Sequence, residues 1–165
     1  MTLNDSSILE ILDNGVLAWA LAACGIAQLL KLVFEIVKYQ RWRPQVLLET
    51  GGMPSSHSAL VTGTAAGVGL ELGFSHPAFA IASTVAFVVM YDASGIRRAA
   101  GVTAARVNLI SSEINKEFAE SQLKENLGHS RLEVFVGSLV GPAVVFPGML
   151  FIGTPLDLLR SIGLS

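Results

Sequence analysis

The chain has 165 residues, of which 52% are hydrophobic and only 15% charged, and its formal net charge is −2. The charged fraction lies well below the roughly 25% of soluble domains, which excludes a disordered chain, a nucleic-acid-binding domain and most soluble enzymes. The single Cys24 excludes a disulfide framework and a cysteine-rich zinc site. The composition therefore predicts a small integral membrane protein with one domain, residues 1–165.

Four apolar stretches predict an all-α membrane bundle with about four transmembrane helices. They cover residues 15–37, 57–74, 77–91 and 132–152. A span needs about 17–25 residues, so the first and fourth fit easily, whereas the second and third are short. The second stretch also fits a buried helix of a soluble protein, but the overall hydropathy favours the membrane.

Small residues and prolines follow a pattern within these stretches. Two glycine pairs with a spacing of four would let helices approach closely, namely Gly63–Gly67 and Gly137–Gly141. Pro142 and Pro147 should kink the last span.

Two segments outside the spans predict surface helices. Residues 4–13 fit a short helix that Asn4 or Asp5 caps, and the start of the chain lacks the basic region of a signal peptide. Residues 94–128 hold much of the remaining charge and predict an amphipathic helix on the membrane surface, covering a site or contacting another subunit. Its apolar stripe consists of Ala100, Ala104, Val107, Ile114 and Phe118.

The cations gather on one side of the predicted membrane. With four spans, ten of the eleven fall on the side where the first span ends, and only Arg160 falls on the other. The ten are Lys31, Lys38, Arg41, Arg43, Arg97, Arg98, Arg106, Lys116, Lys124 and Arg131. The positive-inside rule makes that side cytoplasmic and puts the N-terminus outside. The same clustering also fits a bound anion at that face.

The strongest local motif is GGMPSSHSA at residues 51–59, between a basic loop and an apolar helix. Ser55 and Ser56 are good N-cap residues, and Pro54 blocks helix upstream. The free N–H groups and the dipole of a helix start suit a phosphate. His57 would lie in the first turn, although the pattern also fits a plain N-cap with a surface histidine.

The second motif, LGHSRLEVFVG at residues 127–137, also places a histidine at the start of an apolar helix. Glu133 follows His129 by four residues and so lies on the same helix face. A hydrogen bond from its carboxylate would select one imidazole tautomer and make the other nitrogen a better nucleophile. The alternative is a simple helix-start pair at the interface.

Together the motifs predict phosphate chemistry, because the topology returns both histidines to the cation-rich face. One histidine could attack phosphorus while the other protonates the leaving oxygen. Arginine and lysine side chains would hold the remaining oxygens. His76, on the opposite face, is interpreted as a turn residue.

Three runs in this order, GGMPSSHSALVTG, MYDASGIRRAAG and LKENLGHSRLEVFVG, resemble the divergent branch of the type 2 phosphatidic acid phosphatase (PAP2) family. The resemblance covers roughly residues 27–141. It implies a helical membrane fold related to that of acid phosphatases and vanadium haloperoxidases. The wider superfamily commonly has six spans, so dimerisation could replace the helices that this chain lacks.

The superfamily's first two phosphate motifs are matched in part. The first is Lys, six residues, then Arg-Pro; Arg43 and Pro44 match its end, and Lys31 and Lys38 are the lysines nearest to its start. The second is Pro-Ser-Gly-His, which residues 54–57 match except for Ser in place of Gly. This resemblance implies that Ser55 and Ser56 bind phosphate oxygens and that His57 is the general acid.

The third motif is Ser-Arg, five residues, His, three residues, Asp. The resemblance makes His129 the nucleophile, with Glu133 where Asp is expected. The motif's Arg falls on Leu123, so either the adjacent Lys124 or Arg97 and Arg98 would supply the charge. The second run lies at the end of the third span on the same side, and Asp92 there could hold one of the two arginines.

The sequence thus predicts a membrane lipid phosphatase that acts through a phosphohistidine on a lipid phosphate monoester or diphosphate. Phosphatidic acid, phosphatidylglycerol phosphate and prenyl diphosphate are the candidate substrates. No cofactor, metal or nucleic acid is expected; the expected partners are the lipid substrate, the bilayer and a second copy in a homodimer. The predicted location is a bacterial inner membrane or its organellar equivalent, with the site facing the cytoplasm.

The alternative is a non-catalytic membrane protein with the same fold that binds lipid headgroups or acts as an assembly subunit. The altered first and third motifs favour it. The presence of both histidines together with Glu133 disfavours it, because a scaffold has no evident use for them.

Overall fold

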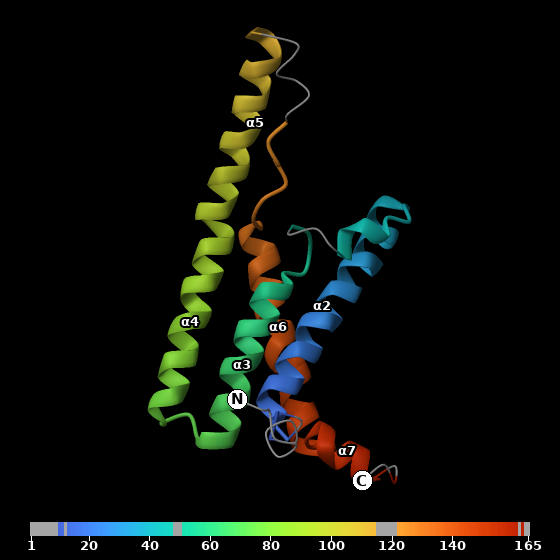
Figure 1. Ribbon diagram of the computed structural model, residues 1–165, viewed down its shortest axis with the longest axis vertical. Coiled ribbons are helices and arrows are strands. Elements are labelled where there is room, and N and C mark those ends of the chain that lie inside the picture. The colour runs from blue at the N-terminus through green and yellow to red at the C-terminus, as the bar shows by residue number, and fades with distance from the viewer. Residues whose placement is uncertain (1–9, 12, 48–50, 115–121, 162, 164–165) are drawn as a thin grey trace, which may run out of the picture.

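The computed structural model describes residues 10–11, 13–47, 51–114, 122–161 and 163 (Figure 1). Within these ranges the chain is helical and without strands, which confirms the all-α prediction. The elements are α2 (Gly15–Tyr39), the 3-10 turn η1 (Pro44–Leu47), α3 (Ser56–Leu72), α4 (Pro77–Ser94), α5 (Ile96–Ile114), α6 (Arg131–Pro147), the π-helical turn η3 (Gly148–Ile152) and α7 (Pro155–Ser161). The predicted surface helix at 4–13, with its caps Asn4 and Asp5, lies mostly outside the described residues.

Helix α3 is the centre of the bundle, and it packs against α2, α4 and α6 (Figure 1). Its buried residues are all small, namely Ser56, Ser58, Ala59, Gly63, Ala65, Ala66, Gly67 and Gly69. A Cβ added at Gly63 would lie 3.5 Å from the Cα atoms of both Ala20 in α2 and Gly141 in α6. The close approach that the glycine pairs predicted is therefore present, and at Gly63 it brings both α2 and α6 against α3.

Three helices in the described ranges are long and apolar enough to cross a membrane: Gly15–Tyr39, Pro77–Ser112 and Arg131–Ile152. Their outward faces carry large apolar side chains, for example Leu29, Phe87 and Leu139, which are more than half exposed. These features fit a bundle whose outer surface faces lipid. Helix α3 has only 17 residues, and its role as a fourth span stays a prediction.

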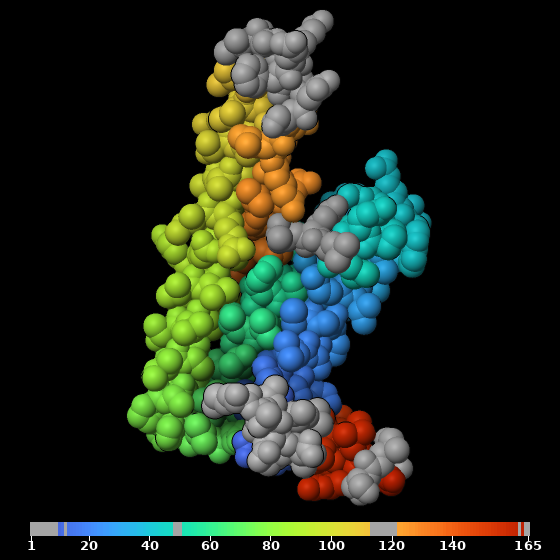
Figure 2. All heavy atoms as spheres, in the orientation of Figure 1, coloured from blue at the N-terminus to red at the C-terminus, as the bar shows by residue number. Residues whose placement is uncertain are grey.

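Helix α5 continues along the axis of α4, so the two form one long rod (Figure 1), and Figure 2 shows α5 extending beyond α2 and α3. The backbone hydrogen bonds run through the junction, because Gly95 N–H donates to Tyr91 O and Ala99 N–H donates to Gly95 O. At 1.5 Å per residue, the 36 residues of Pro77–Ser112 measure about 54 Å, against about 30 Å for the hydrocarbon core. Part of the rod must therefore stand outside the membrane.

The chain does not turn sharply at Gly95, so α5 follows the direction of α4, and the placement of residues 94–128 on the membrane surface stays a prediction. Of the predicted apolar stripe, Ala104 is buried, whereas Ala100 and Val107 are exposed. Phe118 lies outside the described residues. Most side chains of α5 are exposed, and the segment 122–128 runs back beside it toward the bundle (Figure 1).

The prolines of the last span lie in two different settings. Helix α6 continues through Pro142, whereas η3 follows directly after Pro147. At this end of the bundle the Trp19 indole N–H donates to Gly153 O at 2.8 Å, which ties α2 to the end of η3. His76 lies in the loop between α3 and α4, where its Nδ1 accepts the Ala78 N–H, so it is indeed a turn and cap residue.

Candidate active site

The two histidine motifs meet where α3 and α6 begin and α4 ends. His57 and His129 are 72 positions apart in the chain, yet their ring centroids are 6.1 Å apart with the planes inclined by 62°. The main-chain N–H of His129 donates to Ala93 O at 2.9 Å, which joins the start of α6 to the end of α4. Helix packing therefore brings the predicted pair of histidines together.

Local bonds hold His129 in one orientation. Its Nδ1 lies 3.0 Å from Glu133 Oε2, the contact expected from the spacing of four residues. The Glu133 carboxylate also accepts the Ser130 N–H, and Ser130 Oγ accepts the Glu133 N–H, so the two residues form a capping box. Ser130 was not among the predicted site residues, although Ser-x-x-Glu before an apolar run is the signature of this motif.

His129 also borders a small hollow of about 20 Å³. His129 is only 2% exposed, and its Nε2 is buried with no hydrogen-bond partner among the described residues. The hollow is lined by His57, Val89, Asp92, Ala93, Arg97, Gly128 and His129. A proton on Nδ1, shared with Glu133, leaves Nε2 with a free lone pair. A buried acceptor without a partner calls for an explanation, and a ligand group in the hollow would supply one.

Gly128 places His129 against the end of α4. Its φ of +78° lies in the left-handed region, and a Cβ there would be 2.4 Å from Arg98 N and 2.8 Å from Arg97 C. Only glycine fits both the backbone conformation and the space. The Gly-His pair of the second motif is thus explained by close contact with the junction of α4 and α5.

The start of α3 is hydrogen-bonded to α6. Ser55 N–H donates to Glu133 O at 3.0 Å, and Ser55 Oγ, fully buried, accepts bonds from both N–H and O–H of Ser58. Ser56 is 3% exposed. Neither predicted phosphate-binding serine lines the cavities around His129 that the described residues form. Ser55 serves as the N-cap of α3.

Two cations lie close to the histidines. Arg97 Nε donates to Asp92 Oδ2, the partner that the sequence proposed for one of the two arginines. The charges of Arg97 and Lys31 both act electrostatically on His57, and Lys31 is 3% exposed within the bundle. Positive charge beside an imidazole pair favours an anionic ligand there.

A polar cavity of about 530 Å³ adjoins the other side of His129. Its lining includes Arg98, Gly51, Gly52 and Glu133. A second polar cavity, of about 240 Å³, lies between α2 and the same glycine loop and is lined in part by Lys31, Lys38 and Glu133. Glu133 thus borders both cavities, and each is large enough for a phosphate group with its water.

Three predicted phosphate ligands have other surroundings. Arg43 pairs with Glu35 at 3.4 Å. The Lys38 ammonium group lies 5.0 Å and 5.2 Å from the ring centroids of Phe34 and Tyr39. Lys124 is exposed in the segment that runs beside α5. Of these three, only Lys38 borders a cavity shared with Glu133.

Asn108 of α5 binds the segment that leads to His129. No signal in the sequence had marked Asn108 as a residue of the site. Its amide group donates to Leu123 O and Glu125 Oε1 and accepts the Leu123 N–H, each at 2.8 Å. Gly101 allows the same segment to lie directly on α5, since a Cβ there would be 2.5 Å from Glu125 O. The rod therefore supports the loop that carries Gly128 and His129.

We expect Asn108→Ala to loosen this segment without unfolding the bundle. The substitution removes three hydrogen bonds, each with a net value of about 0.5–1.5 kcal/mol, and all of them lie on the exposed part of α5. Amide hydrogen exchange at Leu123 should become several-fold faster, while exchange within α3 stays unchanged. Thr103→Ala is the control, because its hydroxyl donates within α5 to Ala99 O. Equal exchange at Leu123 in both variants would contradict the assignment.

The chain is similar to known proteins over most of its length. A model of the divergent PAP2 family matches residues 12–144. The chain is 38% identical over 146 residues to "Uncharacterized membrane protein YuiD" of Bacillus subtilis (strain 168), covering 81% of this chain and 92% of that protein. No solved structure matches significantly.

Proposed function

The chain belongs to the divergent PAP2 family, and from this premise we propose that it is a membrane lipid phosphatase with a phosphohistidine intermediate. The observation that carries the proposal is the buried His129, which borders the same hollow as His57. Its Nδ1 contacts Glu133, and its Nε2 has no partner among the described residues. A nucleophile held by a carboxylate and facing a second acid–base group is the arrangement that covalent phosphoryl transfer requires.

In the first step Nε2 of His129 attacks phosphorus, and the bond from phosphorus to the leaving alkoxide oxygen breaks. Protonated His57 gives its proton to that oxygen, and Glu133 stabilises the positive charge that develops on His129. In the second step neutral His57 takes a proton from water, the water oxygen bonds to phosphorus, and the P–N bond breaks. Inorganic phosphate leaves, and both histidines return to their starting states.

Charge stabilisation comes from the chain's own cations in this proposal. Arg97 and Lys31 lie close enough to His57 to act on it electrostatically, and Arg98 lines the adjoining polar cavity. These positions suit the oxygens of a transferring phosphoryl group. Asp92 holds Arg97 at the hollow and so limits its loss of side-chain freedom on binding.

The alternative, a non-catalytic lipid-headgroup binder or assembly subunit, has one structural observation in its favour. Ser55 is used as a buried cap and Arg43 is engaged with Glu35, so two of the residues that the superfamily resemblance assigned to phosphate have other partners. A binder would bind lipid phosphate without releasing phosphate from it.

The proposed function is tested by phosphate release from phosphatidic acid, phosphatidylglycerol phosphate and prenyl diphosphate, with purified protein in mild detergent and no added metal. We expect release from at least one of these lipids, and a loss of about 10²–10⁴-fold in rate for His57→Ala. His76→Asn is a matched control, because His76 caps α4 at the far end of the bundle. Binding of the lipids without release would support the alternative instead.

The proposed orientation places the histidines and α5 on the cytoplasmic side. A cysteine at Ser112, which is exposed near the end of α5, should then be shielded from impermeant thiol reagents in intact cells and labelled after lysis. A Cys24→Ser background removes the native thiol. Ready labelling in intact cells would reverse the orientation.

The proposed homodimer is tested by measuring the mass of the protein in mild detergent. A dimer is expected if a second copy replaces the helices that the wider superfamily carries in one chain. A monomer would remove this proposal and leave the assignment of the histidines unchanged.

A further inference from the structure

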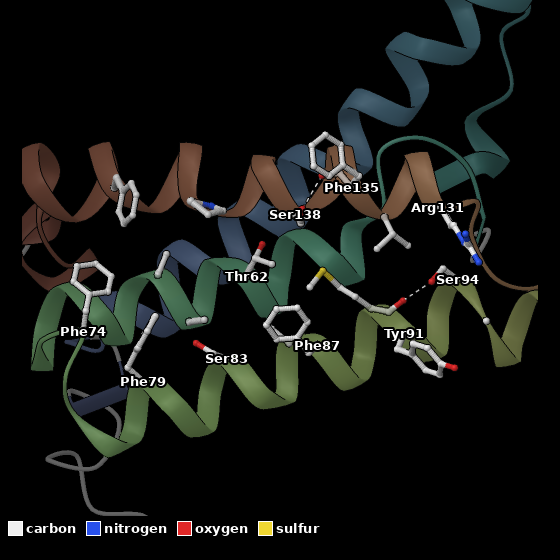
Figure 3. A pocket seen from close by; sticks show the side chains of 18 residues that line it. Thr62, Phe74, Phe79, Ser83, Phe87, Tyr91, Ser94, Arg131, Phe135 and Ser138 are labelled. Carbon is white, nitrogen blue, oxygen red and sulfur yellow. Dashed lines mark hydrogen bonds between the residues drawn. The ribbon is translucent and has the colours of Figure 1, made fainter.

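An apolar cleft of about 920 Å³ runs between α4 and α6, with α3 as its floor (Figure 3). Aromatic side chains line much of it, namely Phe74, Phe79, Phe87, Tyr91, Phe135 and Phe146. The hydroxyls of Thr62, Ser94 and Ser138 donate to carbonyls of their own helices at 2.7–2.9 Å. Because these hydroxyl protons are already engaged, the walls offer a ligand mainly apolar contact.

One end of this cleft is polar and adjoins the candidate active site. Arg131 extends toward Ser94 there (Figure 3). His129 lies two positions before Arg131, and its main-chain bond to Ala93 O joins α6 to α4 at the same level. Arg131 forms no ion pair within the described residues. From the sequence it was only one of the ten cations on this side.

The length of the cleft suits a lipid chain. Along α4 its lining extends from Phe79 to Ser94, which is about 22 Å at 1.5 Å per residue. One leaflet of a bilayer contributes about 15 Å of hydrocarbon. The rim carries exposed Phe87 and Phe135, which face the surroundings of the bundle. A hydrocarbon chain could therefore enter sideways from the bilayer and lie along the whole cleft.

We propose that this cleft binds the hydrocarbon chain of a lipid phosphate, and that Arg131 at its polar end pairs with headgroup oxygens that do not react. The proposal rests on the proposed function for the identity of the headgroup, because the chain would direct the phosphate to His129. Binding in the cleft does not itself require hydrolysis.

Charge complementarity favours this occupant over a helix from a second copy. A transmembrane helix would cover the aromatic walls but would not itself place a phosphate against the exposed Arg131 guanidinium group. A lipid phosphate satisfies the apolar walls and the cation with one molecule. The cleft also reaches Arg131, which follows His129 by two residues, so a lipid in the cleft would have its headgroup near the candidate active site.

The test uses phosphatidic acid with a photoactivatable group in its acyl chain, in vesicles of neutral phosphatidylcholine. Wild-type protein should be labelled on the cleft-lining parts of α4 and α6. Unlabelled phosphatidic acid should compete, whereas diacylglycerol with the same chains should compete at least about tenfold less well. Ser83→Phe, which places a ring inside the cleft, should abolish this labelling. Val85→Phe is the matched control on the exposed face of α4.

Arg131→Gln should reduce the preference for phosphatidic acid over diacylglycerol several-fold, and Arg106→Gln on α5 should leave it unchanged. Equal labelling of the cleft in Ser83→Phe and wild type, or equal competition by both lipids, would overturn the proposal. A dimer cross-linked through Ser83→Cys in a Cys24→Ser background would assign the cleft to a second copy and also overturn it.

Failure of this proposal and failure of the proposed function give different results. Suppose that His129→Ala is still labelled, with phosphatidic acid competing better than diacylglycerol, while neither the wild type nor any variant releases phosphate. The cleft then binds lipid phosphate, and the phosphatase proposal falls. If wild type releases phosphate but Ser83→Phe keeps full activity and labelling, the phosphatase proposal stands and the cleft has another role.

Discussion

His129→Ala is expected to reduce phosphate release by at least about 10³-fold, because it removes the atom that would bond to phosphorus. The remaining rate would come from binding and charge stabilisation alone. The main-chain bond from residue 129 to Ala93 O does not depend on the side chain, so the end of α4 should stay joined to α6. The measurement is initial-rate phosphate release, with the elution volume in size-exclusion chromatography as the check on folding.

The same variant tests the covalent intermediate. Wild-type protein, quenched in base during turnover of a lipid substrate labelled with radioactive phosphate, should retain acid-labile label, and His129→Ala should retain none. The control His76→Asn should release phosphate at the wild-type rate, because His76 lies at the opposite end of the bundle from His129. Label retained by His129→Ala, or equal release by the two proteins, would contradict the assignment of the nucleophile.

Gly137→Ala is expected to destabilise the bundle strongly. The added Cβ would lie 2.3 Å from Ser55 O and 3.0 Å from Ser55 Cβ, and those atoms belong to the main chain and cap at the start of α3. Because backbone cannot rotate away, α3 and α6 would have to separate, at a cost of about 1–3 kcal/mol or more. Thermal unfolding in detergent measures this loss.

Gly25→Ala is the matched control, since a Cβ there meets nothing within 4 Å. The same chemical change should there be neutral or stabilising by up to about 1 kcal/mol, because alanine is the better helix former. The contrast isolates the contact between α3 and α6 from the effect of glycine itself. Similar melting temperatures for the two variants would mean that α3 and α6 do not pack as closely as the structure indicates.

Several properties of this protein follow from its sequence alone because they depend on local spacing or on composition. The low charged fraction and the long apolar runs predict a helical membrane protein. The contact of His129 with Glu133 follows from the four-residue spacing on one helix. The family follows from the order of three short runs. In each case the interacting groups are close in the chain, or the property is a sum over residues.

Other properties depend on how distant segments pack, and the sequence could not provide them. Ser55, which the resemblance implied to be a phosphate ligand, is the buried N-cap of α3, because α6 packs against its carbonyl group. The direction of α5, which continues α4 because the hydrogen bonds run through Gly95, was likewise not evident from the sequence.

The packing of the helices decides which cations lie near the histidines, and it also forms the cleft. Arg97 lines the same hollow as His57 and the charge of Lys31 acts on His57, whereas Arg43 is held by Glu35, although all of them were counted on the same membrane face. The cleft exists because α3 lies between α4 and α6 and holds them apart over most of their length. Hydropathy reports which residues avoid water, but it carries no information on the pairing of helices, and that pairing determines which charge meets which histidine.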